Sequence, residues 1–176
     1  MTVARPRNPL RTYAFRVRLD LASEAVVGVR RVSGLSTTVQ AHETWSGGNA
    51  LHRYASPDRA TWEPITLEQG LALDDSLERW AQACLHYLTT GDAPADVPVK
   101  RDVVIEVWDP HLSGGDLFSE PTGTAPVPRR RDYLVVNAWV SKLQALPALD
   151  AMSNEVGLLT VELTHDGWRP MPPAEA

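Results

Sequence analysis

Histidine and cysteine are the residues of this chain that could most readily bind a metal ion or act in catalysis, so their spacing is the first evidence about function. The histidines are His42, His52, His86, His111 and His165. None of them stands at a spacing typical of a metal site, such as HExxH or HxH. The single cysteine, Cys84, is too few for a cysteine metal site or an internal disulfide, and its type favours a small buried apolar residue. We therefore expect no metal and no cofactor.

A His-Asp pair near the end of the chain, His165 and Asp166, has residue types found in catalytic triads. A triad also needs a nucleophile on a strained turn, and the sequence contains no GxSxG or equivalent motif. Two SGG segments, 46–48 and 113–115, match neither GxGxxG nor a P-loop. The simpler interpretation is a polar pair that closes a strand before Gly167, and the sequence predicts no enzyme.

Six tryptophans are the other group with a potential binding role, because indole rings can stack on sugars or bases. They are Trp45, Trp62, Trp80, Trp108, Trp139 and Trp168. Trp80 lies on the apolar stripe of a predicted helix and the others lie in or beside predicted strands, which favours packing in the core or at an interface. A monomeric binding module that uses these rings is the alternative.

The length and composition indicate an ordinary soluble globular protein. With 176 residues, of which 43% are hydrophobic and 22% charged, the chain suits one domain spanning 1–176. Its net charge of -5 argues against a general affinity for nucleic acid, although Arg129, Arg130 and Arg131 form a local basic patch. No apolar run is long enough to span a bilayer, and no apolar stretch resembling a signal peptide follows the first charges. We expect synthesis in the cytoplasm and no membrane anchor.

Alternating and β-branched segments predict strands. In residues 12–20, apolar side chains at Phe15, Val17 and Leu19 alternate with polar ones, which is typical of a half-buried strand. Further strands are expected in 24–36, from Leu35 onward, and in 62–71, 101–109, 132–143 and 154–166. Segment 43–62 is expected to contain a long polar loop that includes Gly47, Gly48, Asn49, Ser56, Pro57 and Asp58. A loop of this length in a compact domain usually has a function.

One helix is predicted by apolar residues at helical spacing. Asp75 is its expected N-cap, Glu78 completes a capping box, and Gly91 is its expected end. The apolar stripe consists of Leu77, Trp80, Ala81, Cys84 and Leu88. About seven or eight strands with one helix between the fourth and fifth predict a mainly β fold, an antiparallel β-sandwich or barrel with one packed α-helix.

Several segments occur in an order that is informative as a whole. They are NPLRTYAFRVRLD (8–20), VSGLS (32–36), HETWSGGNALHRY (42–54), ITLEQGLALDDSLERWA (65–81), RDVVIEVWD (101–109), NAWVSKLQALPALDAMSNEV (137–156) and LTHDGW (163–168). Their succession resembles the inner tail-tube proteins of contractile phage tails and of phage-tail-like contractile injection systems. No single motif is specific, but together they cover most of the chain.

The resemblance implies a non-enzymatic structural protein. In that family six subunits supply strands to a shared barrel, and the hexameric rings stack into a hollow tube inside a contractile sheath. The implied partners are copies of the chain itself, sheath and baseplate proteins, and cargo in the lumen. The alternation in 13–19 and 156–164 agrees with strands that face a wet lumen on one side and pack on the other.

The polar loop and one insertion are the candidate contact regions. The loop from Ser46 to Ser56 is expected to touch neighbouring subunits or rings, because it is polar and glycine-containing and has aromatic rings at its borders. Its candidate contact residues are Trp45, Gly47, Gly48, Asn49, His52 and Tyr54. The second region is an inserted loop at about 109–131, where relatives commonly turn quickly, and Arg129, Arg130 and Arg131 would suit an acidic partner.

The insertion leaves two roles open within the family. The chain is either the repeated subunit of the tube or the baseplate-proximal ring that initiates the tube. From a different class, the monomeric β-sandwich binding module is the alternative, and a hydrolase is less favoured still.

Overall fold

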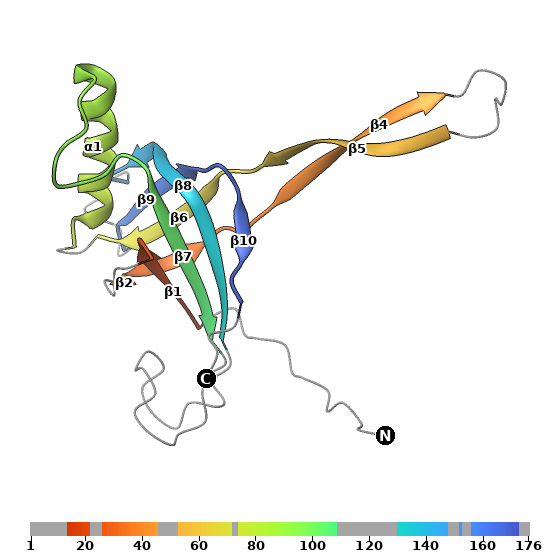
Figure 1. Ribbon diagram of the computed structural model, residues 1–176. Coiled ribbons are helices and arrows are strands. Elements are labelled where there is room, and N and C mark those ends of the chain that lie inside the picture. Colours follow the sequence, from red (N-terminus) through yellow and green to blue (C-terminus); the bar gives the residue numbers. More distant parts are fainter. Residues whose placement is uncertain are drawn as a thin grey trace, which may run out of the picture.

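The computed structural model describes residues 14–21, 26–45, 53–71, 74–108, 130–147, 152 and 156–172. Within these residues the chain forms ten strands and one helix (Figure 1). The strands are β1 (Phe15–Leu19), β2 (Val26–Val27), β3 (Val29–Val32), β4 (Thr37–Trp45), β5 (Arg53–Trp62), β6 (Ile65–Gly70), β7 (Arg101–Trp108), β8 (Arg130–Gln144), β9 (Leu158–Thr164) and β10 (Trp168–Pro170). The helix, α1 (Ser76–Thr90), lies between β6 and β7 in the chain.

Eight of the strands form one antiparallel sheet in the order β2-β1-β7-β8-β9-β6-β3, with β10 paired to β8. The long strand β8 joins two halves of this sheet, since it pairs with β7 and β10 through its first half and with β9 through its second half. The sheet is not closed, and β2 and β3 stand at its two ends. The prediction of a mainly β, antiparallel, sandwich-like fold with one helix is confirmed. We call this sheet together with α1 the body.

A corner in β8 explains how one strand serves both halves of the sheet. Asn137 has a left-handed backbone, with a φ of 51°, which asparagine tolerates better than most residues. Its backbone N–H donates to Asp102 Oδ1 at 3.0 Å, and its side-chain amide donates to Asp166 Oδ2 at 3.0 Å. The pairing of β8 changes from β7 to β9 just after this residue. Hydrogen bonds from both sides therefore hold the corner.

The hydrophobic core lies between the two halves of the sheet and α1. Side chains from β1, β6, β7, β8 and β9 meet those of the helix in one cluster. Trp80 is fully buried there, and its indole Nε1–H donates to the backbone oxygen of Val99 at 3.0 Å, which satisfies the polar atom of the ring. Cys84 is also buried, and burial raises the pKa of its thiol. The predicted packing roles of Trp80 and Cys84 are confirmed.

Two details of α1 differ from the prediction. Asp75 occupies the N-cap position without a side-chain capping hydrogen bond, and Asp74 Oδ1 instead accepts from the backbone N–H of Ser76 at 3.1 Å. Leu88, assigned to the buried stripe, is 76% exposed. All residues from 85 to 90 are exposed, because the helix extends about one and a half turns beyond the part that the sheet covers. Gly91 ends the helix in the left-handed conformation, as predicted.

The predicted strands occur with three corrections. The expected strand 24–36 is divided at Gly28, since β2 pairs with β1 whereas β3 pairs with β6. The polar loop is shorter than expected, because β5 begins at Arg53 and therefore contains Ser56, Pro57 and Asp58. Proline is tolerated there because one edge of β5 pairs with no strand that the structure describes. The short strand β10 was not predicted.

The ends of β7 and β8 lie on either side of the predicted insertion. Trp108, the last residue of β7, is directly opposite Arg130, the first residue of β8. Arg130 and Arg131, expected in the inserted loop, therefore belong to a strand. Residues 109–129, including Arg129, lie outside the described residues. The single domain with one insertion stays a prediction.

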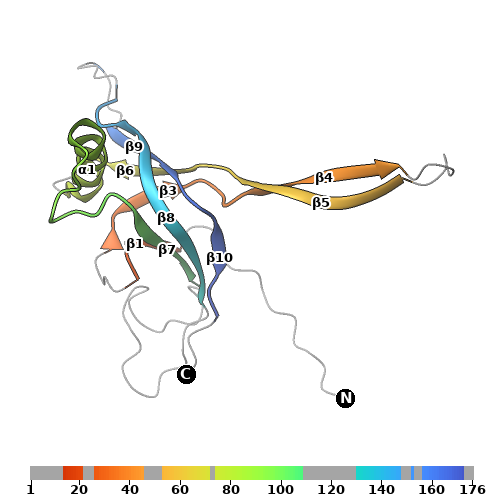
Figure 2. The same cartoon turned by 45° about the horizontal axis from the view of Figure 1, so that its top comes forward.

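The strands β4 and β5 form a separate two-stranded hairpin. It projects to one side of the body, whereas α1 lies at the opposite side (Figures 1 and 2). The chain leaves the body after β3 and returns to it directly before β6. The hairpin is thus an arm inserted between two paired strands of the sheet.

Candidate assembly surface

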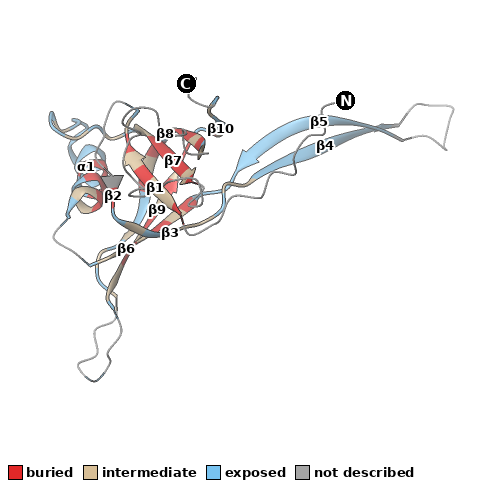
Figure 3. Ribbon diagram, turned by 90° about the horizontal axis from the view of Figure 1, so that it is seen from below, coloured by how far each residue is buried: buried red, intermediate tan, exposed pale blue. Residues whose placement is uncertain are grey.

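The hairpin is exposed along its described length. Residues 37–44 and 54–62 are all exposed, as the pale blue ribbon of Figure 3 shows. A two-stranded hairpin is marginally stable by itself in water, and unpaired strand edges are templates for pairing with another chain. The arm therefore has the properties of a surface that another protein covers.

The root of the hairpin is held to the body by close contacts. The backbone N–H of Glu63, just after β5, donates to the oxygen of Ser36, just before β4, at 3.3 Å. The ring of Trp62 lies against Gly167, where a Cβ atom would be 3.3 Å from Trp62 Cε2. Gly167 also has a φ of 138°, so a side chain there would be strained as well as crowded. Glycine at this position therefore lets the arm approach the body.

His165 is the buried polar residue at this root. Its Nδ1 accepts a hydrogen bond from the backbone N–H of Gly167 at 3.1 Å, so the ring proton lies on Nε2. Nε2 is 3.2 Å from the backbone oxygen of Glu63 and donates to it. The neighbouring Asp166 instead binds Asn137. The pair closes β9, as predicted, and His165 links the arm to the turn between β9 and β10.

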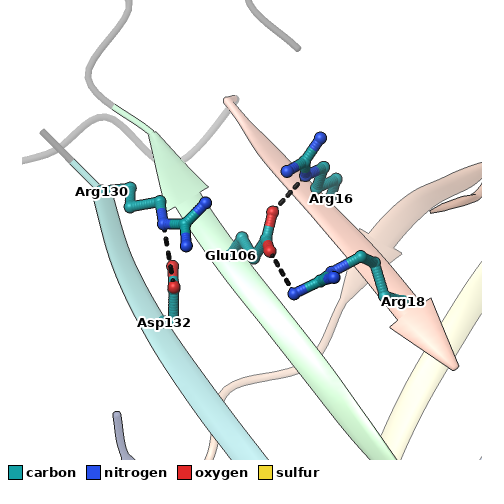
Figure 4. A network of polar contacts seen from close by, with 5 residues as sticks. All are labelled: Arg16, Arg18, Glu106, Arg130 and Asp132. Atoms are coloured by element: carbon teal, nitrogen blue, oxygen red, sulfur yellow. Dashed lines mark hydrogen bonds and ion pairs between the residues drawn. The ribbon is translucent and has the colours of Figure 1, made fainter. Parts of the chain in front are cut away.

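A cluster of charged side chains lies on one face of β1, β7 and β8 (Figure 4). Glu106 is fully buried between two arginines. Arg16 Nε donates to Glu106 Oε2, and Arg18 Nη2 lies 2.9 Å from Glu106 Oε1. On the neighbouring strand, Arg130 Nε lies 3.0 Å from Asp132 Oδ2. The buried carboxylate of Glu106 is therefore neutralised by charge from the adjacent strand.

Trp108 and Asp132 complete this cluster. The guanidinium carbons of Arg16 and Arg130 lie 4.8 Å and 5.6 Å from the centre of the Trp108 ring, within the range of cation–π attraction. Burial raises the pKa of Asp132; Arg130 opposes this change and the neighbouring Glu106 adds to it. The arrangement positions and neutralises charges across three strands, which fixes their register.

The candidate contact residues from the sequence fall in two separate places. Trp45 and Tyr54 lie toward the free end of the hairpin, where Tyr54 pairs with Thr44 and is 64% exposed. Arg130 belongs to the charged cluster, and Arg131 lies over the Tyr133 ring at 5.5 Å. Gly47, Gly48, Asn49 and His52 lie outside the described residues, as does Arg129. The structure therefore does not bring the two groups of candidates together.

Apart from Arg130, the residues of the charged cluster were not among the sequence candidates. The signal available was a single acidic residue, Glu106, within the apolar run of 103–108, and two arginines alternating with apolar residues in 15–19. Arg16 and Glu106 are 90 positions apart in the chain, so spacing alone could not pair them.

Among the described residues, no group of three or more His, Cys, Asp or Glu side chains is placed to hold a metal ion. In the same part of the chain, no helix is long and apolar enough to cross a membrane.

Comparison with known families gives one match that covers most of the chain. Residues 11–169 match the family of T4-like virus tail tube protein gp19. None of the curated protein sequences matches this chain.

Several solved structures share the fold of this chain. A chain of the anti-feeding prophage cap, the AFP tube terminating cap, is 20% identical with a TM-score of 0.65, over 97% of this chain and 95% of that one. A chain of the AFP baseplate is 18% identical with a TM-score of 0.66, over 97% and 100%. A chain of the extended PVC sheath-tube complex, an extracellular contractile injection system, is 19% identical with a TM-score of 0.64, over 93% and 91%. At these identities, the likeness establishes a shared fold.

Proposed function

Since the chain belongs to the family of T4-like virus tail tube protein gp19, we propose that it is the repeated, non-enzymatic structural subunit of the inner tube of a phage tail or contractile injection system. The observation that carries this proposal is the exposed hairpin, an arm that pairs with no other described strand. In a tube, each arm would be covered by the next subunit.

The subunit would form hexameric rings that stack inside a contractile sheath. The open ends of the sheet support this arrangement, because β2 and β3 have edges that no described strand covers. A heterologous contact of this kind closes into rings when the rotation between neighbours permits it. The sheath, the baseplate and cargo in the lumen are the further partners, and the chain would be made in the cytoplasm before assembly.

The contacts between rings or neighbours would include the free end of the hairpin. Trp45 and Tyr54 lie toward that end, and the segment with Gly47, Gly48, Asn49 and His52 connects β4 to β5. Arg131 is exposed at the start of β8, where it suits an acidic group on a sheath or baseplate protein.

The second candidate role is the baseplate-proximal initiator of the tube. The observation in its favour is the direct pairing of Trp108 with Arg130, because the segment encoded between these two residues would add bulk to every ring of a polymer. We favour the repeated subunit because residues 11–169 match the family of a tail tube protein.

Copy number separates the two roles. Quantitative mass spectrometry of purified particles should give a count that scales with particle length; about six copies per particle would instead establish the initiator. Deleting Gly114 to Pro126 is an independent check. A repeated subunit should still polymerise by itself, whereas an initiator should lose its attachment to the baseplate.

Size-exclusion chromatography and negative-stain microscopy of the purified chain test the class of function. Rings or tubes are expected. A protein that stays monomeric at every concentration would support the β-sandwich binding module in place of the tube subunit.

A further inference from the structure

The two faces of the hairpin differ in chemistry. Side chains of directly paired residues lie on the same face, and faces alternate along a strand. The register places the following residues on one side: Val39, Ala41, Ala55, Pro57, Ala60 and Trp62, accompanied by Thr37 and Glu43. The other side carries Thr38, His42, Thr44, Tyr54, Ser56 and Thr61. One side, which we call the apolar arm face, is therefore mainly apolar, and the other is mainly polar.

A β-bulge keeps the apolar arm face continuous. The register shifts by one residue between Val39 and Ala41, because β5 has one extra residue there. Ala60 pairs with Val39 and Pro57 pairs with Ala41, so both lie on the same side although they are three positions apart. Without the bulge, the alternation in β5 would move one of them to the polar side. The irregularity thus preserves the difference between the faces.

The apolar arm face is exposed in the single chain. Val39 is 59% exposed and Trp62 is 41% exposed. The nine residues of β4 span about 30 Å at the usual rise of a strand, so the face is long as well as apolar. A long apolar face on a hairpin that is marginally stable by itself favours burial against a partner.

A second exposed apolar surface lies at the other side of the body. The backbone N–H of Leu71 donates to the oxygen of Gly157 at 3.0 Å, and the Leu71 side chain and Pro147 both lie beside Gly157. Leu71 is exposed here (44%), as are Leu146 (62%) and Val156 (72%), the chain neighbours of Pro147 and Gly157, and we call these three residues the end patch. The end patch lies where β6 and β8 end and β9 begins, on the side of α1 and away from the hairpin (Figures 1 and 3).

We propose that the apolar arm face of one copy packs on the end patch of a second copy of this chain. The two surfaces have the same apolar character and stand at opposite sides of one molecule, so a single chain cannot join them. Repeating the contact from copy to copy buries both surfaces and gives a head-to-tail interface, the kind that closes into rings or continues as a filament. This inference rests on the proposed tube function and specifies its contact.

Disulfide trapping tests this contact. A chain with Ala60→Cys and Val156→Cys should give a ladder of covalent oligomers on a non-reducing gel after mild oxidation, because each bond joins two copies. Cys84 is buried and stays in place. The matched control is Thr61→Cys with Val156→Cys, since Thr61 is next to Ala60 but on the polar side of the hairpin, and it should give at least about tenfold less ladder. Equal ladders from these two double variants would overturn the proposal. The absence of a ladder from the Ala60→Cys, Val156→Cys variant would also overturn it, provided that this variant assembles.

A charge substitution provides the second measurement. Ala60→Glu should raise the concentration needed for assembly by at least about tenfold, because the contact would bury an unpaired carboxylate. Thr61→Glu should assemble like the unmodified chain. If a chain with Ala60→Cys and Leu88→Cys forms the ladder instead, the apolar arm face packs on the exposed end of α1, and its proposed packing on the end patch is wrong. If the unmodified chain never assembles, the proposed tube function is wrong. If it assembles but the Ala60 variants behave like their controls, only the proposed contact is wrong.

Discussion

Strands β4 and β7 have similar lengths, nine and eight residues, but opposite surroundings. β7 pairs with β1 on one side and β8 on the other, and five of its residues are buried, among them Glu106 and Trp108. Among the described strands β4 pairs only with β5, and its residues from 37 to 44 are all exposed. The body is therefore stabilised within one chain, whereas the arm would, in the proposed tube, be stabilised by contacts with other subunits. Substitutions should separate the two regions, with effects on folding in the body and effects on assembly in the arm.

The largest effect on folding is expected from Trp80→Ala. This change removes a fully buried ring and the hydrogen bond to Val99, and should lower the free energy of unfolding by about 3 to 5 kcal/mol. Chemical denaturation of the monomeric protein measures it. Arg79→Ala is the control, because Arg79 is exposed and its ion pair with the exposed Asp75 is a surface pair, so its effect should stay within about 0.5 kcal/mol. Equal losses in the two variants would contradict the assigned buried face of α1.

Glu106→Gln should come next. It leaves the partly buried Arg16 and Arg18 without their shared carboxylate, so we expect a loss of about 2 to 3 kcal/mol in the free energy of unfolding. Glu68→Gln is the matched control, since Glu68 faces the exposed Arg31 at 3.4 Å and should change stability by less than about 0.5 kcal/mol. A Glu106 variant as stable as the control would show that the charged cluster contributes no net stability.

His165→Leu probes the boundary between the two regions. The leucine keeps an apolar side chain of similar size but removes the acceptor for the Gly167 N–H, which should cost about 1 to 2 kcal/mol. Hydrogen exchange should speed up first at Gly167 and Glu63, at the root of the arm, with β7 less affected. His42→Leu, on the exposed polar side of the hairpin, should leave the exchange of these amides unchanged. Uniformly faster exchange across β7 would mean that His165 supports the whole body.

The smallest effect on folding is expected from shortening the end of the arm. Replacing Gly47 through His52 by a short Gly-Ser turn changes no residue of the core that the structure describes, so the free energy of unfolding should change by less than about 0.5 kcal/mol. Assembly should nevertheless be poor, because this segment is proposed to contact neighbouring subunits. Normal-length tubes from this variant would remove the segment from the contact surface.

The same contrast explains what could be predicted from the sequence. The strands β1, β6, β7, β8 and β9 and the buried residues of α1 follow apolar periodicity, because one face of each packs on the core. The hairpin lacks this periodicity, because neither side of its described strands packs on the core. Near the start of β5 its apolar side consists of Ala55 and Pro57, and its register contains a bulge, so residues 53–58 resemble a polar loop.

Partners between distant strands could not be predicted either. The buried position of Glu106 depends on which strands flank β7, and that order is a property of the whole sheet. The exposure of Leu88 depends on where the sheet stops covering α1. Tertiary packing decides both features. The spacing of apolar residues within one helix or strand carries no information about that packing.

The direct pairing of Trp108 with Arg130 has a practical consequence for protein engineering. Because the chain leaves β7 and re-enters β8 at adjacent positions, the ends of anything encoded between them are already side by side. Lengthening such a connection adds little closure entropy, about 0.6 kcal/mol for each doubling. A foreign peptide or a small domain whose termini are close together could be encoded at this point without altering the strand register. If the chain assembles as proposed, every subunit would then display one copy of the fused sequence, at a density determined by the repeat of the assembly.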